Sequence, residues 1–257
     1  MRPHLPELPL ARDRRELLLT RTAQLPCRKL TVRDIEKAGF LIAGEGRLAV
    51  YWCPTDLPPR VNREVLVMLV GLTPGFQQAR LAYEAARDAI SANPGLTYGR
   101  ACTVANQVAA FEGMRKLIWT WLDALHVHEY LGVDSCESLF GEHGELLAVT
   151  SAVRYPVFID GKNYSGSNGG LLTKHRVLVP FIDRLLAADM RRFPNALVVP
   201  LGKAVESAME YLVVNERLAR DQVLFGFPHP SGANGSKKEQ WNAMRPQMQR
   251  EVDRWFG

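Results

Sequence analysis

Two short loops carry residue types that could do chemistry. The first spans Gly71 to Gly75 with the sequence GLTPG, and the second spans Pro228 to Gly232 with the sequence PHPSG. Glycine at both ends of the first loop lets backbone N–H groups turn toward a ligand, while the proline stiffens the turn. In the second loop His229 is fixed between two prolines, and the hydroxyl of Ser231 can bond a phosphate or the imidazole. A lone His-Pro turn is more often structural, so the elements around both loops matter.

Both loops follow apolar runs that predict strands. The four runs, each bounded by turn residues, are Val65–Val70, Leu146–Val153, Ala196–Leu201 and Gln222–Phe227. Runs this short and this apolar are typical of strands buried on both faces of a parallel sheet. Segments with helical spacing lie between and after them, namely Ala79–Ile90, Gly113–Leu125, Pro180–Met190, Lys203–Val213 and Glu239–Phe256, the last interrupted by Pro246.

This alternation of strand and helix predicts the α/β class. We expect a three-layer αβα sandwich around a central, mainly parallel four-stranded sheet. Ligands of such sheets bind at the carboxyl ends of the strands, which is where both loops begin.

The first 60 residues follow a different pattern. Thr31 to Ala38 predicts a short helix capped by Thr31, with Asp34 at the capping-box position. Phe40 to Trp52 predicts a hairpin around the glycines at 44 and 46. We interpret residues 1–60 as an appendage packed on the core, and residues 61–257 as a single α/β domain.

Composition excludes several classes of protein. The chain has 257 residues, 47% of them hydrophobic, which is enough for a sizeable core and argues against disorder. No apolar run approaches the roughly 20 residues of a membrane span, and the N-terminal 15 residues hold no signal sequence. The four cysteines are scattered without a CxxC pair, which favours reduced thiols in the cytoplasm. We expect a monomer without cofactor or metal, whose net charge of +5 permits DNA as a partner.

The two loops, in this order, resemble the first and last motifs of the uracil-DNA glycosylase superfamily. Its members carry Gly-x-Asn-Pro-Gly or Gly-x-Asp-Pro-Tyr after the first strand, and His-Pro-Ser after the last. Thr150–Pro156 is similar to the family's Thr-Asn-x-x-Lys-x-x-Pro segment, and Val198–Ala204 is similar to its third strand and the following Leu-Gly-x-x-Ala. Phe111 and Gly113 match the Phe-x-Gly of several branches. The resemblance covers roughly residues 61–257.

The resemblance implies a metal-independent DNA glycosylase, which flips a damaged or modified pyrimidine out of the helix and hydrolyses its N-glycosidic bond. His229 is then the donor to the base oxygen, and Thr73 occupies the position of the residue that orients the attacking water. The implied base-binding residues are Gly71, Leu72, Gly75, Phe111 and Ser151. The implied DNA contacts are Ser231, Asn234, Lys237, Lys238 and Arg154, with Lys203 as a weaker candidate.

Three departures from the family pattern bear on the substrate. Thr73 stands where most members have Asp or Asn, and Ser151 stands where they have the Asn that reads the pyrimidine. Gly75 replaces the Tyr with which uracil-strict members exclude 5-substituted bases. With the polar loop Asp160–Asn168, these residues suggest a roomier pocket for a 5-modified or glycosylated pyrimidine. The carboxylates that could replace the missing acid are Glu84, Asp88 and Asp160.

Several alternatives stay open at this point. Phe111 could be a core aromatic, the lysine pair at 237–238 a solvated turn, and the loop after Asp160 a flexible connection. One branch of the superfamily holds an iron–sulfur cluster, but these cysteines lack its close pair and Tyr155 falls where that branch has Cys, so we expect no cluster. The enzyme could serve antiviral defence instead of repair. A rival of another class is a catalytically silent DNA-binding relative.

Overall fold

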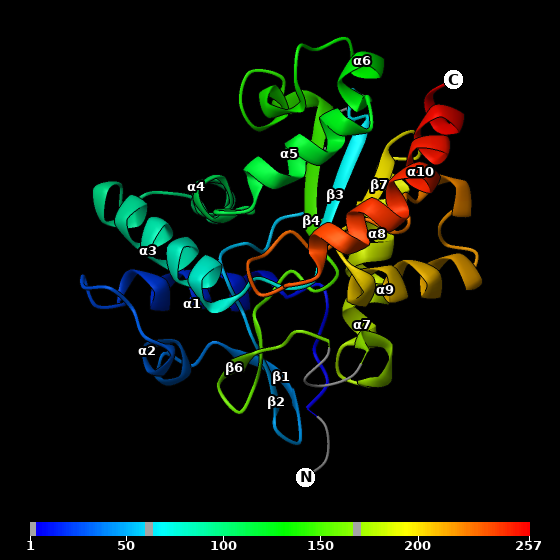
Figure 1. The fold of residues 1–257 in the computed structure, drawn as a ribbon. Helices are drawn as coiled ribbons and strands as arrows, with labels where there is room; N and C mark the ends of the chain where they lie inside the picture. The colour runs from blue at the N-terminus through cyan, green and yellow to red at the C-terminus, as the bar shows by residue number, and fades with distance from the viewer. Residues whose placement is uncertain (1–3, 60–63, 167–170) are drawn as a thin grey trace. The chain divides into compact units, whose positions relative to one another are not determined.

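The computed structural model describes residues 4–59, 64–166 and 171–257 (Figure 1). The chain is mixed α/β and divides into two compact units built from interleaved segments. The antiparallel unit comprises Met1–Pro58, Thr73–Glu112 and Val153–Leu185, and the parallel unit comprises Pro59–Leu72, Gly113–Ala152 and Leu186–Gly257. The predicted division at residue 60 stays a prediction.

The parallel unit is built on a three-stranded sheet. Strand β3 (Val67–Gly71) lies between β4 (Leu147–Ser151) and β7 (Leu197–Pro200), and it pairs in parallel with both (Figure 1). All five residues of β3 are buried, so other parts of the chain cover both faces of the strand. Three of the four predicted strands are therefore confirmed, together with their parallel direction.

The prediction of a fourth strand at Gln222–Phe227 is wrong. Only Val223 in this run forms a bridge, a single parallel one to Val198 of β7. The run begins in the 3₁₀ turn η5 (Arg220–Gln222), and Gly226 adopts a positive φ of 96° that interrupts an extended chain. Among the described residues the parallel sheet thus has three strands instead of four.

The predicted helices of the parallel unit are confirmed. They are α5 (Arg115–Ala124), α9 (Lys203–Val214) and α10 (Lys237–Phe256), the last running through Pro246. The predicted helix at 180–190, which begins in the antiparallel unit and ends in the parallel unit, is helical throughout but changes its winding. Its segments α7 (Val179–Phe181) and α8 (Ala187–Arg192) flank a π-helical turn, η4 (Ile182–Leu186). Further short elements of the parallel unit are α6 (Val127–Leu131), η1 (Cys136–Phe140) and η2 (Gly144–Leu146).

The antiparallel unit contains the predicted hairpin and extends it. Strands β1 (Leu41–Glu45) and β2 (Leu48–Tyr51) pair around a turn in which Gly46 has a φ of +60°, as two-residue hairpin turns require. Strands β5 (Val157–Ile159) and β6 (Lys162–Asn163) continue the sheet in the order β1-β2-β5-β6.

The helices of the antiparallel unit are partly those expected. Helix α2 (Val32–Lys37) is confirmed, and the backbone N–H of Thr31 donates to the Asp34 carboxylate over 2.7 Å, as a capping box requires. Helix α3 (Phe76–Ala92) is also confirmed. The helices of this unit that were not predicted are α1 (Arg12–Ala23), α4 (Tyr98–Ala109) and the 3₁₀ turn η3 (Leu172–Lys174). None of the helices in the described ranges is long and apolar enough to cross a membrane.

Candidate functional site

The predicted site residues are divided between the two units. The parallel unit contains Gly71, Leu72, Ser151, His229, Ser231, Asn234, Lys237 and Lys238, and the antiparallel unit contains Thr73, Gly75, Phe111 and Arg154.

The His229 loop lies against the carboxyl end of β7. The backbone N–H of Gly202, just beyond β7, donates to the carbonyl of Phe227 over 2.9 Å. Gly202 has a φ of +90°, and a Cβ built on it would lie 2.8 Å from the Cβ of His229. Only glycine permits both this conformation and this approach.

The register of the sheet brings further predicted residues to the same edge. Gly71 is the last residue of β3 and lies opposite Ser151, the last residue of β4. On the other side of β3, the N–H of Leu201 donates to the carbonyl of Val70 over 2.9 Å. His229, Gly71 and Ser151 therefore share the carboxyl edge of one parallel sheet, where ligands of such sheets bind.

The imidazole of His229 is held in one tautomer. The backbone N–H of Ser231 lies 3.2 Å from Nδ1 of His229 and can only donate, so Nδ1 accepts and the neutral ring carries its proton on Nε2. Burial also lowers the pKa of His229 from its ordinary value of 6.5. At neutral pH this side chain is thus an uncharged donor through Nε2.

The chain before His229 is anchored by side chains that sequence reasoning missed. The Glu206 carboxylate, in the first turns of α9, accepts the N–H of Gly226 over 2.5 Å, and burial raises the pKa of Glu206. The ring of Phe227 meets Trp121 and Trp241 edge-on at 5.6 and 6.1 Å, and the two indoles stack on each other at 5.0 Å. A tryptophan in each of two amphipathic helices is the only sequence signal for this cluster.

Polar side chains that follow His229 form hydrogen bonds within their own loop. Nδ2 of Asn234 donates to the carbonyl of His229 over 3.1 Å, and Nζ of Lys237 donates to the carbonyl of Asn234 over 3.2 Å. Lys238 is exposed, and Ser231 is half-buried. Of the four DNA contacts predicted in this loop, Lys238 is the one whose side chain is directed to solvent without a described internal bond.

The Gly75 turn is closed by a side chain from β6. Oδ1 of Asn163 accepts the N–H of Phe76 at the start of α3 over 2.8 Å, and a Cβ built on Gly75 would lie 3.3 Å from Nδ2 of Asn163. The predicted loop Asp160–Asn168 is thus partly a strand that packs on this turn. Its residues 167 and 168 lie outside the described part of the chain.

The remaining predicted residues of the antiparallel unit are less exposed to solvent than expected. The hydroxyl of Thr73 donates to the carbonyl of Pro74 over 3.4 Å. Phe111 is buried with 6% exposure at a φ of +51°, and Arg154 is buried with 7% exposure. The burial of Arg154 argues against its predicted contact with a DNA backbone.

Arg154 belongs to the surroundings of a buried acid that was not predicted. Asp56 is 8% exposed and accepts hydrogen bonds from the hydroxyls of Tyr155 and, over 2.6 Å, of Tyr98. The pKa of Asp56 is raised, because the effect of burial exceeds that of the two phenols and of the charges of Arg154 and Arg15, which lower it. The hydroxyl of Thr55 also donates to the carbonyl of Arg154 over 2.8 Å, so the network ties two distant segments together.

The carboxylates considered as substitutes for the missing acid are all engaged in ion pairs. The pairs are Glu84 with Arg80 at 2.6 Å, Asp88 with Arg87 at 2.8 Å, and Asp160 with Arg47 at 2.9 Å.

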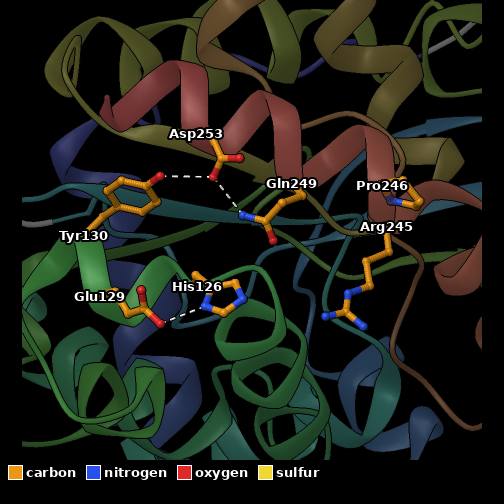
Figure 2. A pocket seen from close by; sticks show the side chains of 7 residues that line it. All are labelled: His126, Glu129, Tyr130, Arg245, Pro246, Gln249 and Asp253. Carbon is orange, nitrogen blue, oxygen red and sulfur yellow. Dashed lines mark hydrogen bonds and ion pairs between the residues drawn. The ribbon is translucent and has the colours of Figure 1, made fainter.

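A cavity of about 680 Å³ lies in the parallel unit and contains none of the predicted residues (Figure 2). Figure 2 shows that its polar groups face one another: Tyr130 donates to Asp253 over 3.0 Å, and His126 lies 2.7 Å from Glu129. Gln249 donates to the same Asp253 over 2.8 Å. The cavity lies between α10 and the segment formed by α6 and its N-cap residue His126. In the described ranges no cluster of His, Cys, Asp and Glu is suited to a metal ion.

The fold and the site define an α/β protein with a neutral histidine held at the carboxyl edge of a parallel sheet. The chain is 34% identical over 225 residues to "Uncharacterized protein YoxB" of Bacillus subtilis (strain 168), an alignment covering 87% of this chain and 86% of that protein. The chain therefore belongs to the family of YoxB. No protein-family model matches the sequence, and no solved structure matches it significantly.

Proposed function

We propose that the protein is a DNA glycosylase that hydrolyses the N-glycosidic bond of a flipped pyrimidine. The observation that carries the proposal is the Nε2–H donor of His229, fixed by Ser231 at the edge of the sheet that also holds Gly71 and Ser151. A pyrimidine leaving a deoxyribose takes the electrons of the broken C–N bond and becomes an anion. A fixed N–H aimed at the developing oxyanion lowers the barrier to that step.

The other roles follow from the resemblance described above. A water molecule adds to the sugar carbon as the base departs and releases its proton to solvent. Ser151 offers one hydroxyl to the edge of the base, and the backbone N–H groups of the turn after β3 offer further donors. Lys238 binds a phosphate of the DNA. The protein acts as a cytoplasmic monomer without a cofactor, in repair or in antiviral defence.

The finer architecture is part of the same proposal. We propose that helices cover both faces of the parallel sheet in a three-layer αβα arrangement. The burial of every residue in β3 supports this, since a sheet open on one face would leave alternate residues exposed.

The substrate is a pyrimidine with a substituent at C5. The residue that ends the first loop is Gly75, which has no side chain to exclude such a group, and a polar amide from Asn163 takes the place beside it.

A second candidate function is DNA binding without catalysis. It is favoured by Thr73, which offers no carboxylate to the water, and by the ion pairs that occupy Glu84, Asp88 and Asp160.

A substrate panel separates the two functions. The protein is incubated with duplexes that contain uracil, a G·T mismatch, 5-hydroxymethylcytosine or its glucosylated form, and abasic sites are then cleaved with alkali. We expect strand breaks on a 5-modified substrate, and their loss in His229→Ala. Binding to all four duplexes without a break on any of them would establish the silent relative and overturn the glycosylase.

A further inference from the structure

Asn234 occupies a central position in the loop that joins His229 to α10. Its side-chain Nδ2 donates to the carbonyl of His229 and to Oε1 of Gln240, both over 3.1 Å. Its Oδ1 accepts the hydroxyl of Ser236 at 3.4 Å, its backbone N–H donates to the carbonyl of Ser231 over 3.2 Å, and its own carbonyl accepts Nζ of Lys237. Every polar group of Asn234 is therefore engaged between residues 229 and 240.

These contacts fix the turn that holds the imidazole. Pro230 has no N–H, so the first backbone donor after the ring is Ser231, which bonds Nδ1 of His229. Asn234 bonds the same turn twice, because its side-chain Nδ2 donates to the carbonyl of His229 and its backbone N–H donates to the carbonyl of Ser231. A carbonyl can only accept, so the Asn234 amide must face His229 with its nitrogen.

We propose that Asn234 is a positioning residue, which holds the His229–Ser231 turn so that the imidazole keeps Nδ1 as acceptor and presents Nε2–H. Asn234 acts through the backbone and touches neither base nor phosphate. The consequence for catalysis rests on the proposed glycosylase function, whereas the consequence for the state of the ring does not.

The state of the ring can be measured without any substrate. Long-range ¹H–¹⁵N spectra of protein labelled at histidine distinguish the two neutral tautomers. We expect a single Nε2–H form of His229 in the native protein, and a mixture of both forms in Asn234→Asp and Asn234→Ala, because neither variant can donate to the carbonyl of His229. Gln240→Ala, which leaves that contact in place, is a milder variant in which we expect a smaller change of the same kind.

A matched control is Asn215→Asp. Asn215 is exposed at the end of α9, and its Nδ2 donates to the carbonyl of Tyr211 over 2.7 Å, so the same chemical contact is lost away from His229. We expect the His229 signals to be unchanged in this control. An unchanged tautomer in both Asn234 variants, with folded spectra, would overturn the proposal.

On a duplex that the native protein cleaves, Asn234→Asp should lower the single-turnover excision rate by at least about 10-fold with DNA affinity within about twofold. A loss of affinity at an unchanged rate would instead make Asn234 a DNA contact and overturn the proposal. If the native protein cleaves no duplex while the tautomer still changes in the variants, the positioning role stands and the glycosylase function fails.

Discussion

The backbone N–H of Ser231 donates to Nδ1 of His229 over 3.2 Å, which leaves Nε2 as the protonated nitrogen of the neutral ring. Burial of the same ring lowers its pKa. The two effects act together, because the tautomer leaves Nε2–H as a donor and the lowered pKa favours the uncharged ring, as the proposed reaction requires beside a departing pyrimidine anion.

The first prediction concerns acid stability. The unfolded chain takes up a proton on His229 near pH 6.5, whereas the folded chain does so only at lower pH. The stability that this difference supplies is present above pH 6.5 and is lost as the pH falls through the folded pKa. We therefore expect the free energy of unfolding, measured with urea at several pH values, to fall less on acidification in His229→Gln than in the native protein. If the free energy of unfolding falls equally in the two proteins as the pH is lowered, the lowered pKa of His229 is contradicted.

The second prediction concerns the approach of the His229 loop to β7. Gly202→Ala forces a non-glycine residue to a φ of +90° and places its Cβ 2.8 Å from that of His229. Strain of this kind costs about 2 kcal/mol, and we expect at least that loss in the free energy of unfolding measured with urea. Gly235→Ala is the control, since a Cβ there meets nothing within 4 Å. Equal effects of the two substitutions would refute the close approach.

A third prediction tests the buried acid of the antiparallel unit. Asp56→Ala leaves the hydroxyls of Tyr98 and Tyr155 without their acceptor, and an unsatisfied buried hydroxyl costs about 1–3 kcal/mol. We expect Asp56→Ala to lower the free energy of unfolding by about 3 kcal/mol. Tyr155→Phe removes only one donor and should cost less than half as much in the same urea titration. A loss in Asp56→Ala no larger than in Tyr155→Phe would show that the acid does not join the two phenols.

The fourth prediction concerns the lysine at the start of α10. If exposed Lys238 contacts a phosphate, Lys238→Ala should weaken DNA binding and reduce the slope of log affinity against log salt by about 0.9. Lys29→Ala removes an exposed lysine before α2 that the proposal does not use, and should leave the slope unchanged. Fluorescence anisotropy at four salt concentrations measures both slopes. The same slope in Lys238→Ala and the native protein would remove this residue from the DNA interface.

The parts of the fold that could be predicted are those that local patterns encode. The apolar runs of β3, β4 and β7 and the capping residues of α2 are visible within a few neighbouring residues. The run at 222–227 has the composition of a strand, but Gly226 adopts a positive φ and donates its N–H to Glu206, 20 positions away, and composition reveals neither feature.

The parts that could not be predicted depend on contacts between distant residues. Strand β5 has three residues, too few to show alternation, and is a strand because it pairs with β2. Asp56 and Tyr155 are separated by 99 positions, so nothing local marks their bond. In the site, the position of Gly71 followed from strand order. His229 does not follow a strand, and its loop reaches the same sheet edge through the bond from Gly202 to Phe227. Local sequence marks neither this bond, nor the internal bonds of Asn234, nor the burial of Arg154.

The most direct test of the account is the single-turnover excision rate of His229→Ala on a duplex that the native protein cleaves, measured with enzyme in excess over DNA. A fixed donor to a developing oxyanion typically contributes a factor of 100 or more. We therefore predict a fall of at least about 100-fold, with a DNA dissociation constant within about twofold of the native value. A variant that excises the base at the native rate would contradict the central role of His229.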